Sequence, residues 1–352
     1  MRDLKHLIYF ESLLENADND LVKQAQAEGK LAIGYTCYHM PEPLLNLPGC
    51  FCVRLSAPRP GSLDIATYYF SNYTCEYARA LVERGMEGGY QFLDALAGVD
   101  ACSMMNRAME HFEILQMNDK PNFFVTHCDI PYKITDYTLD SYVKQMRRRV
   151  LDPLTEKYGV DTSDAAIRQA VKEHNEVCSI ISEIGELRKE ENPVITGYEF
   201  HVLNLVSFTC PKYLILPYLR ETLTELKQRK PDPKPAFRAR VAIVGSEIDD
   251  PQLTKLIEGC GALVVSDRYC FGSTPGREII ELKDDEDALP QICMHIMKHS
   301  ECARYIADEK VQQRRETADR LAREYHADGI IYEQMKYCDY WGFERALVSH
   351  IM

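Results

Sequence analysis

Cysteine is the residue type in this 352-residue chain most suited to chemistry, with 13 copies. An odd total spread over a long chain is unlike the paired cysteines of a small secreted scaffold. In a reducing compartment such thiols serve as core residues, metal ligands or redox groups. Zinc-ribbon, thioredoxin-type and zincin sites are excluded on spacing, because the chain has no C-x-x-C and no H-E-x-x-H.

Six of the cysteines either lie at or just past a predicted strand or precede a predicted helix. Parallel sheets place ligands at the carboxyl ends of their strands, and a helix N-terminus favours a thiolate. If two domains turn these edges toward a common cleft, thiolates far apart in sequence converge on one metal cluster. The six are Cys37, Cys75, Cys102, Cys128, Cys270 and Cys338.

The other cysteines are expected to be buried core residues. Cys50 and Cys52 alternate with Phe51 and Val53 in a predicted strand, where a small apolar side chain fits best. The same interpretation covers the cysteines in predicted helices or at their ends, which are Cys178, Cys210, Cys260, Cys293 and Cys302.

Short apolar runs separated by helical stretches predict parallel βαβ units, and hence an α/β fold. A helical arm is expected over 1–29 and a first α/β domain over 30–138. The predicted strands of this domain are Leu31–Tyr35, Cys50–Leu55, Gly98–Met105 and Asn122–Cys128.

A helical connecting region is predicted over 139–235. Ser163 is its expected N-cap, and an apolar stripe runs from Ile167 to Ile184. The proline-rich segment Lys230–Pro235 cannot continue a helix and marks a domain boundary.

A second α/β domain is predicted over 236–352. Its expected strands are Val241–Gly245, Ala262–Val265 and Gly329–Tyr332. The chain ends at Met352, where a parallel sheet normally adds another strand, so this domain is expected to be truncated.

Charge and motifs exclude several classes of function. The formal net charge of −13 argues against nucleic acid or an anionic membrane as the main partner. No apolar run is long enough to span a membrane, and the N-terminal residues lack the apolar region and cleavage site of a secretory signal, so a cytoplasmic protein is expected. Neither G-x-G-x-x-G nor a P-loop is present, and G-x-S-x-G is missing as well.

Several short segments resemble landmarks of the 2-hydroxyacyl-CoA dehydratase and benzoyl-CoA reductase family, over about residues 28 to 350. The Lys-Tyr-Cys-Asp element is the most specific of them. They are Ala32-Ile33-Gly34-Tyr35 with Cys37 and Pro41-Glu42, Tyr73-Thr74-Cys75, the Gly98-Val99 strand, and Met335-Lys336-Tyr337-Cys338-Asp339.

The resemblance implies a D-component subunit with two Rossmann-like domains. Such a subunit holds a [4Fe-4S] cluster through three cysteines and leaves one iron open. It works with a related second subunit, or as a homodimer, and receives one electron from an ATP-dependent Fe–S activator, in anaerobic metabolism. The implied reaction is elimination of water from a 2-hydroxyacyl-CoA thioester through a ketyl radical, or a related aryl-CoA reduction. The acyl group and the catalytic residues stay unknown.

Carried over by position, Cys75 and Cys338 match the first and third cluster cysteines. The second falls on Met105-Asn106, and methionine is a weak replacement for thiolate. Cys102, three residues earlier, is expected to serve as the second ligand instead.

Two alternatives stay open. Cys37 and Cys270 match positions that are cysteine in double-cubane proteins, which hold an [8Fe-9S] cluster and reduce small molecules. Together with Cys75, Cys338, Cys102 and Cys128, they make six candidate ligands for two linked cubanes. The other alternative is a partner subunit that has lost its cluster at Met105 and is not catalytic.

Overall fold

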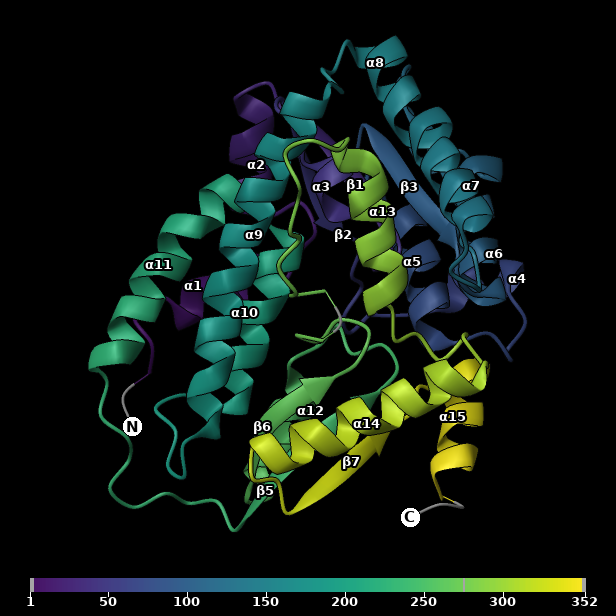
Figure 1. The fold of residues 1–352 in the computed structure, drawn as a ribbon. Helices are drawn as coiled ribbons and strands as arrows, with labels where there is room; N and C mark the ends of the chain where they lie inside the picture. The colour runs from purple at the N-terminus through teal and green to yellow at the C-terminus, as the bar shows by residue number, and fades with distance from the viewer. Residues whose placement is uncertain (1–2, 275, 350–352) are drawn as a thin grey trace.

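The computed structural model describes residues 3–274 and 276–349 of the chain. Its strands form two sheets, and every pairing among the described residues is parallel (Figure 1). The first sheet has the order β2-β1-β3-β4 and the second the order β6-β5-β7. This confirms the predicted α/β class and is consistent with two Rossmann-like domains. The strands are β1 (Leu31–Tyr35), β2 (Cys50–Arg54), β3 (Ala95–Asp100), β4 (Phe124–Asp129), β5 (Ala239–Gly245), β6 (Ala262–Arg268) and β7 (Gly329–Glu333).

One predicted strand is wrong in its bounds. The expected strand Gly98–Met105 starts at Ala95 and ends at Asp100, and α6 (Ser103–Ile114) follows almost at once. Met105 is therefore a helical residue that packs into the core. The end of β3 and the start of α6 both carry apolar side chains, so the two elements form one largely apolar segment in the sequence. The pattern of apolar residues alone therefore predicted the end of the strand in the wrong place.

The N-terminal arm consists of two short helices, α1 (Leu7–Leu13) and α2 (Asp20–Ala27). The Asn19 side chain caps α2 by accepting hydrogen bonds from the backbone N–H groups of Leu21 and Val22. The arm packs on the helical layer through α1 and α10.

The helical layer runs between the two sheets in sequence. Ser163 caps α9 as predicted, because its hydroxyl accepts from the backbone N–H of Ala166 at 3.3 Å. The apolar stripe from Ile167 to Ile184 is buried. The layer comprises α7 (Asp136–Met146), the π-helix η1 (Arg147–Leu151), α8 (Asp152–Tyr158), α9 (Asp164–Glu186), the 3-10 turn η2 (Leu187–Lys189), α10 (Gly197–Thr209) and α11 (Lys212–Gln228).

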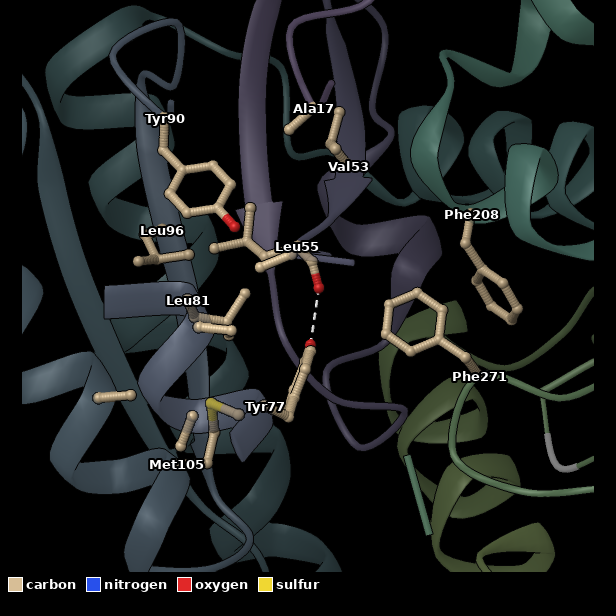
Figure 2. Close-up of a cluster of buried hydrophobic side chains, with 14 of the residues drawn as sticks. Ala17, Val53, Leu55, Tyr77, Leu81, Tyr90, Leu96, Met105, Phe208 and Phe271 are labelled. Atoms are coloured by element: carbon tan, nitrogen blue, oxygen red, sulfur yellow. Dashed lines mark hydrogen bonds between the residues drawn. The ribbon is translucent and has the colours of Figure 1, made fainter. Parts of the chain in front are cut away.

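Helix α10 packs against both sheets. All of its residues are buried, and it contacts both β2 and β6. One apolar cluster accordingly includes Leu96 of the first sheet and Val264 of the second. In Figure 2, Leu55, Tyr77 and Phe271 of this cluster lie at the junction of the two halves, and the Tyr77 hydroxyl donates to the Leu55 carbonyl at 2.6 Å.

The remaining helices pack on the sheets or on other helices. Although α13 follows the second sheet's β6 in sequence, it packs on α7 and α9, whereas α14 packs on β5 and β6 (Figure 1). Among the described residues, none of the helices combines the length and the apolar character that a membrane crossing requires. These helices are α3 (Glu42–Leu45), α4 (Asp64–Tyr69), α5 (Glu76–Met86), α12 (Gln252–Gly259), α13 (Ala288–His299), α14 (Asp308–Glu324) and α15 (Asp339–Ser349).

Candidate metal centre

A cavity of about 150 Å³ lies at the carboxyl ends of strands from both sheets. A cavity of this size can hold a benzene-sized group. Segments that follow β1, β3, β5, β6 and β7 all contribute to its wall. This is the edge at which parallel sheets place their ligands.

Six cysteines line this cavity, although 301 positions separate the first from the last in sequence. Five of them belong to the predicted set, and the sixth is Cys302. The six are Cys37, Cys75, Cys102, Cys270, Cys302 and Cys338.

Three of the six, which we call the helix-end trio, stand at the starts of helices. Cys75 is the N-cap of α5 and Cys102 the N-cap of α6, where its Sγ accepts from the backbone N–H of Met105 at 3.4 Å. Cys338 directly precedes α15, after a turn in which Tyr337 adopts a positive φ of 67°. Helix N-termini carry partial positive charge, which offsets part of the cost of a buried thiolate at all three positions.

The other three, which we call the loop trio, are Cys37, Cys270 and Cys302. Cys37 and Cys270 each lie two residues past a strand, β1 and β6 respectively. Cys302 lies in the loop between α13 and α14. His39 links two of these loops, since its Nδ1 is 3.4 Å from Cys37 Sγ and its Nε2 is 2.6 Å from Ser300 Oγ.

Burial raises the pKa values of these thiols, and neighbouring thiols raise several of them further. Burial, reinforced by the thiols of Cys75, Cys338 and Cys302, raises the pKa of Cys102 to about 12. Burial and the Cys302 thiol likewise raise the pKa of Cys37 to about 11. Metal binding here must displace protons, so metal affinity is expected to rise with pH.

Two arginines and two glutamates lie on the cavity wall. Arg268 and Glu301 form a close pair, with Nε 2.6 Å from Oε2. Arg54 Nη2 lies 3.7 Å from Glu247 Oε1, and burial raises the pKa of this glutamate to about 8 despite the opposing effect of Arg54.

The donor set fits an iron–sulfur cluster better than a single ion. Cysteine thiolates are the ligands of such clusters. Within the described part of the chain, no three histidine, cysteine or acidic side chains stand at the spacing that one metal ion requires. The six thiols around the cavity would instead supply thiolate ligands to a multi-iron group.

The structure separates Cys128 from the predicted set. Cys128 lies within β4, opposite Val99 of β3, and its side chain is fully buried in the apolar core with Tyr142. Both faces of this sheet are covered by other elements, so a side chain near the end of a strand can point into the core instead of the cavity. The position of Cys128 near a strand end was therefore not enough to predict its direction.

Two expectations about individual cysteines are corrected by the structure. Cys302 is neither in a helix nor at a helix end. It lies in the loop between His299, where α13 ends, and Asp308, where α14 begins. The polar pair Ser300-Glu301 after an apolar helix is the sequence signal for this break. Cys260, expected to be a buried core residue, is exposed at the C-terminal end of α12.

Residues 37–352 match the family described as "2-hydroxyglutaryl-CoA dehydratase, D-component". The chain is 22% identical to the (R)-phenyllactyl-CoA dehydratase beta subunit of Clostridium sporogenes, over 94% of this chain and 85% of that protein. It is 20% identical to a subunit of the benzoyl-CoA reductase of Thauera aromatica, over 96% and 87% respectively. It is 21% identical to the beta subunit of (R)-2-hydroxyglutaryl-CoA dehydratase from Acidaminococcus fermentans, over 94% and 87%.

Proposed function

The chain belongs to the 2-hydroxyglutaryl-CoA dehydratase D-component family, and we propose that it is the iron–sulfur subunit of a dehydratase- or reductase-type enzyme. The observation that carries the proposal is the convergence of six thiols, from both halves of the chain, on one buried cavity. Free cysteines in cores act as small hydrophobes, a role that does not require six of them to share one wall.

Of the two cluster forms considered, the larger accounts for more of the cavity. A single [4Fe-4S] cluster with an open iron uses three thiolates and leaves three without a role. Two linked cubanes, as in an [8Fe-9S] cluster, use all six. The division into a helix-end trio and a loop trio supplies three ligands for each half. We therefore propose a double-cubane reductase of small molecules, with Cys302 in the place that sequence analysis assigned to Cys128.

The cluster, when bound, supplies single electrons of low potential and a Lewis-acidic iron. The chain supplies the surroundings. Tyr77, Met335 and Trp341 form apolar parts of the cavity wall and exclude water. A dry wall protects a radical or a strongly reduced species from side reactions.

A second candidate is a 2-hydroxyacyl-CoA dehydratase subunit with one [4Fe-4S] cluster. The helix-end trio of Cys75, Cys102 and Cys338 would hold this cluster, and a CoA thioester would be the substrate. One observation in its support is that each of these three thiols lies at the N-terminus of a helix. The other is that the relatives are dehydratase and reductase subunits whose names include CoA thioesters.

The relatives are subunits, so a partner is part of the proposal. We propose a related second subunit or a second copy of this chain. We also propose that the electron comes from an ATP-dependent Fe–S activator. Nucleic acid and membrane are not proposed as partners.

The test is the amount of iron and acid-labile sulfide per chain after anaerobic purification, with electron paramagnetic resonance before and after dithionite. About eight irons are expected for the double cubane and about four for the single-cluster dehydratase. A chain that binds no iron even after anaerobic reconstitution would leave only the cluster-free partner subunit.

The iron content of single cysteine variants tests which thiols bind the cluster. Cys302→Ser is expected to lower the iron content if the loop trio holds a cluster and to leave four irons unchanged if it does not. Cys75→Ser is expected to lower the iron content for either cluster form. The matched control is Cys128→Ala, which removes a buried thiol outside the cavity and should retain all iron.

A further inference from the structure

Arg54 is a buried cation on the wall of the thiol cavity. It is the last residue of β2, and its side chain is only 3% exposed. The guanidinium carbon lies 3.9 Å from the ring centre of Phe271, the residue that follows Cys270. In Figure 2, Phe271 lies between Tyr77 and Phe208, and its ring contacts both edge-on. This aromatic support holds the guanidinium in place without using its N–H donors.

The donors of Arg54 are incompletely satisfied. Its buried Nε has no hydrogen-bond partner among the described residues. Its ion-pair partner, Glu247 Oε1, is 3.7 Å from Nη2, too far for a hydrogen bond, and is itself without one. Arg268 on the same wall differs, because its Nε donates to Glu301 at 2.6 Å. A buried guanidinium N–H with no acceptor in the protein requires one from outside it, such as a water molecule or a bound group.

We propose that Arg54 is a positioning residue that raises the reduction potential of the iron–sulfur cluster bound beside Cys37 and Cys270. The inference rests on the proposed function and deepens it. A guanidinium stays charged in proteins, so Arg54 offers a permanent positive charge and a free N–H donor to this side of the cavity. Each electron that the cluster accepts adds negative charge, and a buried cation stabilises the reduced form.

Cys37 and Cys270 line the same cavity as Arg54, and Cys270 directly precedes Phe271, the residue whose ring the guanidinium lies against. Both residues belong to the loop trio. Arg54 thus acts on the half of the site that distinguishes the double cubane from the single cluster.

The test compares neutral and charged replacements of Arg54 in the anaerobically reconstituted holoprotein. The one-electron midpoint potential is measured by titration with dithionite, which donates the electron, and followed by electron paramagnetic resonance. Arg54→Met keeps an apolar stem over Phe271 but removes the charge. We expect the equilibrium constant for reduction to fall at least tenfold, a shift of about 59 mV to more negative potential. Arg54→Lys keeps the charge, so a smaller shift is expected.

The matched control is Arg59→Gln. Arg59 lies in the loop after β2, is 58% exposed and pairs with Asp250 at 3.1 Å. Its charge is screened by solvent, so the potential should not move.

The outcomes separate this inference from the proposed function. A wild-type chain without iron would overturn the proposed function. Iron-loaded wild type and Arg54→Met with the same potential would overturn the role of Arg54 alone. Loss of iron from both Arg54 variants would also overturn it, because Arg54 would then be needed to retain the cluster rather than to set its potential.

Discussion

Lys212 Nζ donates to Glu42 Oε1 at 2.8 Å, in an ion pair whose side chains are 1% and 6% exposed. Lys212 begins α11 of the helical layer, and Glu42 begins α3, five residues after Cys37. Glu42 also accepts from the Tyr35 hydroxyl at 2.7 Å. The ion pair therefore links the helical layer to the segment after β1, which contains Cys37.

Lys212→Met is expected to destabilise the protein strongly. The substitution leaves the Glu42 carboxylate buried without its main counter-charge, which costs about 3 to 5 kcal/mol. Urea unfolding at neutral pH measures the loss. Lys227→Met in the same helix is the control, since Lys227 and Glu183 are half-exposed and such a pair contributes about 0 to 1 kcal/mol. Equal losses in the two variants would contradict a structural role for the buried pair.

Stability is expected to fall as pH rises, through His174. Its Nδ1 lies 3.0 Å from Glu42 Oε2 and its Nε2 lies 3.3 Å from Cys178 Sγ. Burial opposes the charged ring, but Cys178 and Glu42 outweigh burial and raise the pKa of His174 to about 9. A folded pKa above the unfolded value of about 6.5 stabilises the fold fully below pH ~6.5, and this contribution is lost as pH rises to about 9.

The shift corresponds to about 3 kcal/mol, at roughly 1.4 kcal/mol per pKa unit. The free energy of unfolding, measured by urea at pH 6 and at pH 9.5, should therefore decline less in His174→Gln than in the wild type. Because Cys178 and Glu42 contact the ring, the difference between the two proteins reports the three groups together. The same decline in both would show that the ring is not charged in the folded state.

The fold was largely predictable because its signals are local. The strand Leu31–Tyr35 and the cap at Ser163 depend on neighbouring residues, and both are found where expected. The position of Cys75 before a helix was predictable for the same reason. Cys128 shows the limit of such reasoning, because whether a strand residue faces a cavity or the core depends on the layers packed on each side.

Cys302 and Arg54 could not be placed from the sequence for a different reason. Cys302 reaches the cavity only because α13 packs on α7 and α9, which returns the following loop to the sheet edges. Arg54 reads as an ordinary charged residue that ends a strand. Its burial depends on Phe271, which lies more than 200 positions away in sequence. Both placements are products of tertiary packing, which no local pattern encodes.

Gly245 offers a test of how closely the second sheet positions its share of the site. It ends β5 opposite Glu333 of β7, and a Cβ on Gly245 would lie 2.1 Å from the Glu333 carbonyl oxygen. That atom is backbone, so β7 itself would have to move. The segment that follows β7 carries Cys338 and is tied to β5 by the hydrogen bond from Met335 N–H to Ser246 Oγ, at 2.7 Å.

Gly245→Ala is therefore expected to cost about 1 to 3 kcal/mol in urea unfolding, and to lower the iron content by displacing Cys338. Gly259→Ala is the control. Gly259 is the last residue of α12, and a Cβ added there would meet no neighbouring atom within 4 Å, so alanine should stabilise the helix by about 0.5 to 1 kcal/mol and leave iron unchanged. If Gly245→Ala retained full stability and full iron, β7 would have room to shift without moving its thiol, and the placement of Cys338 would not depend on this close approach.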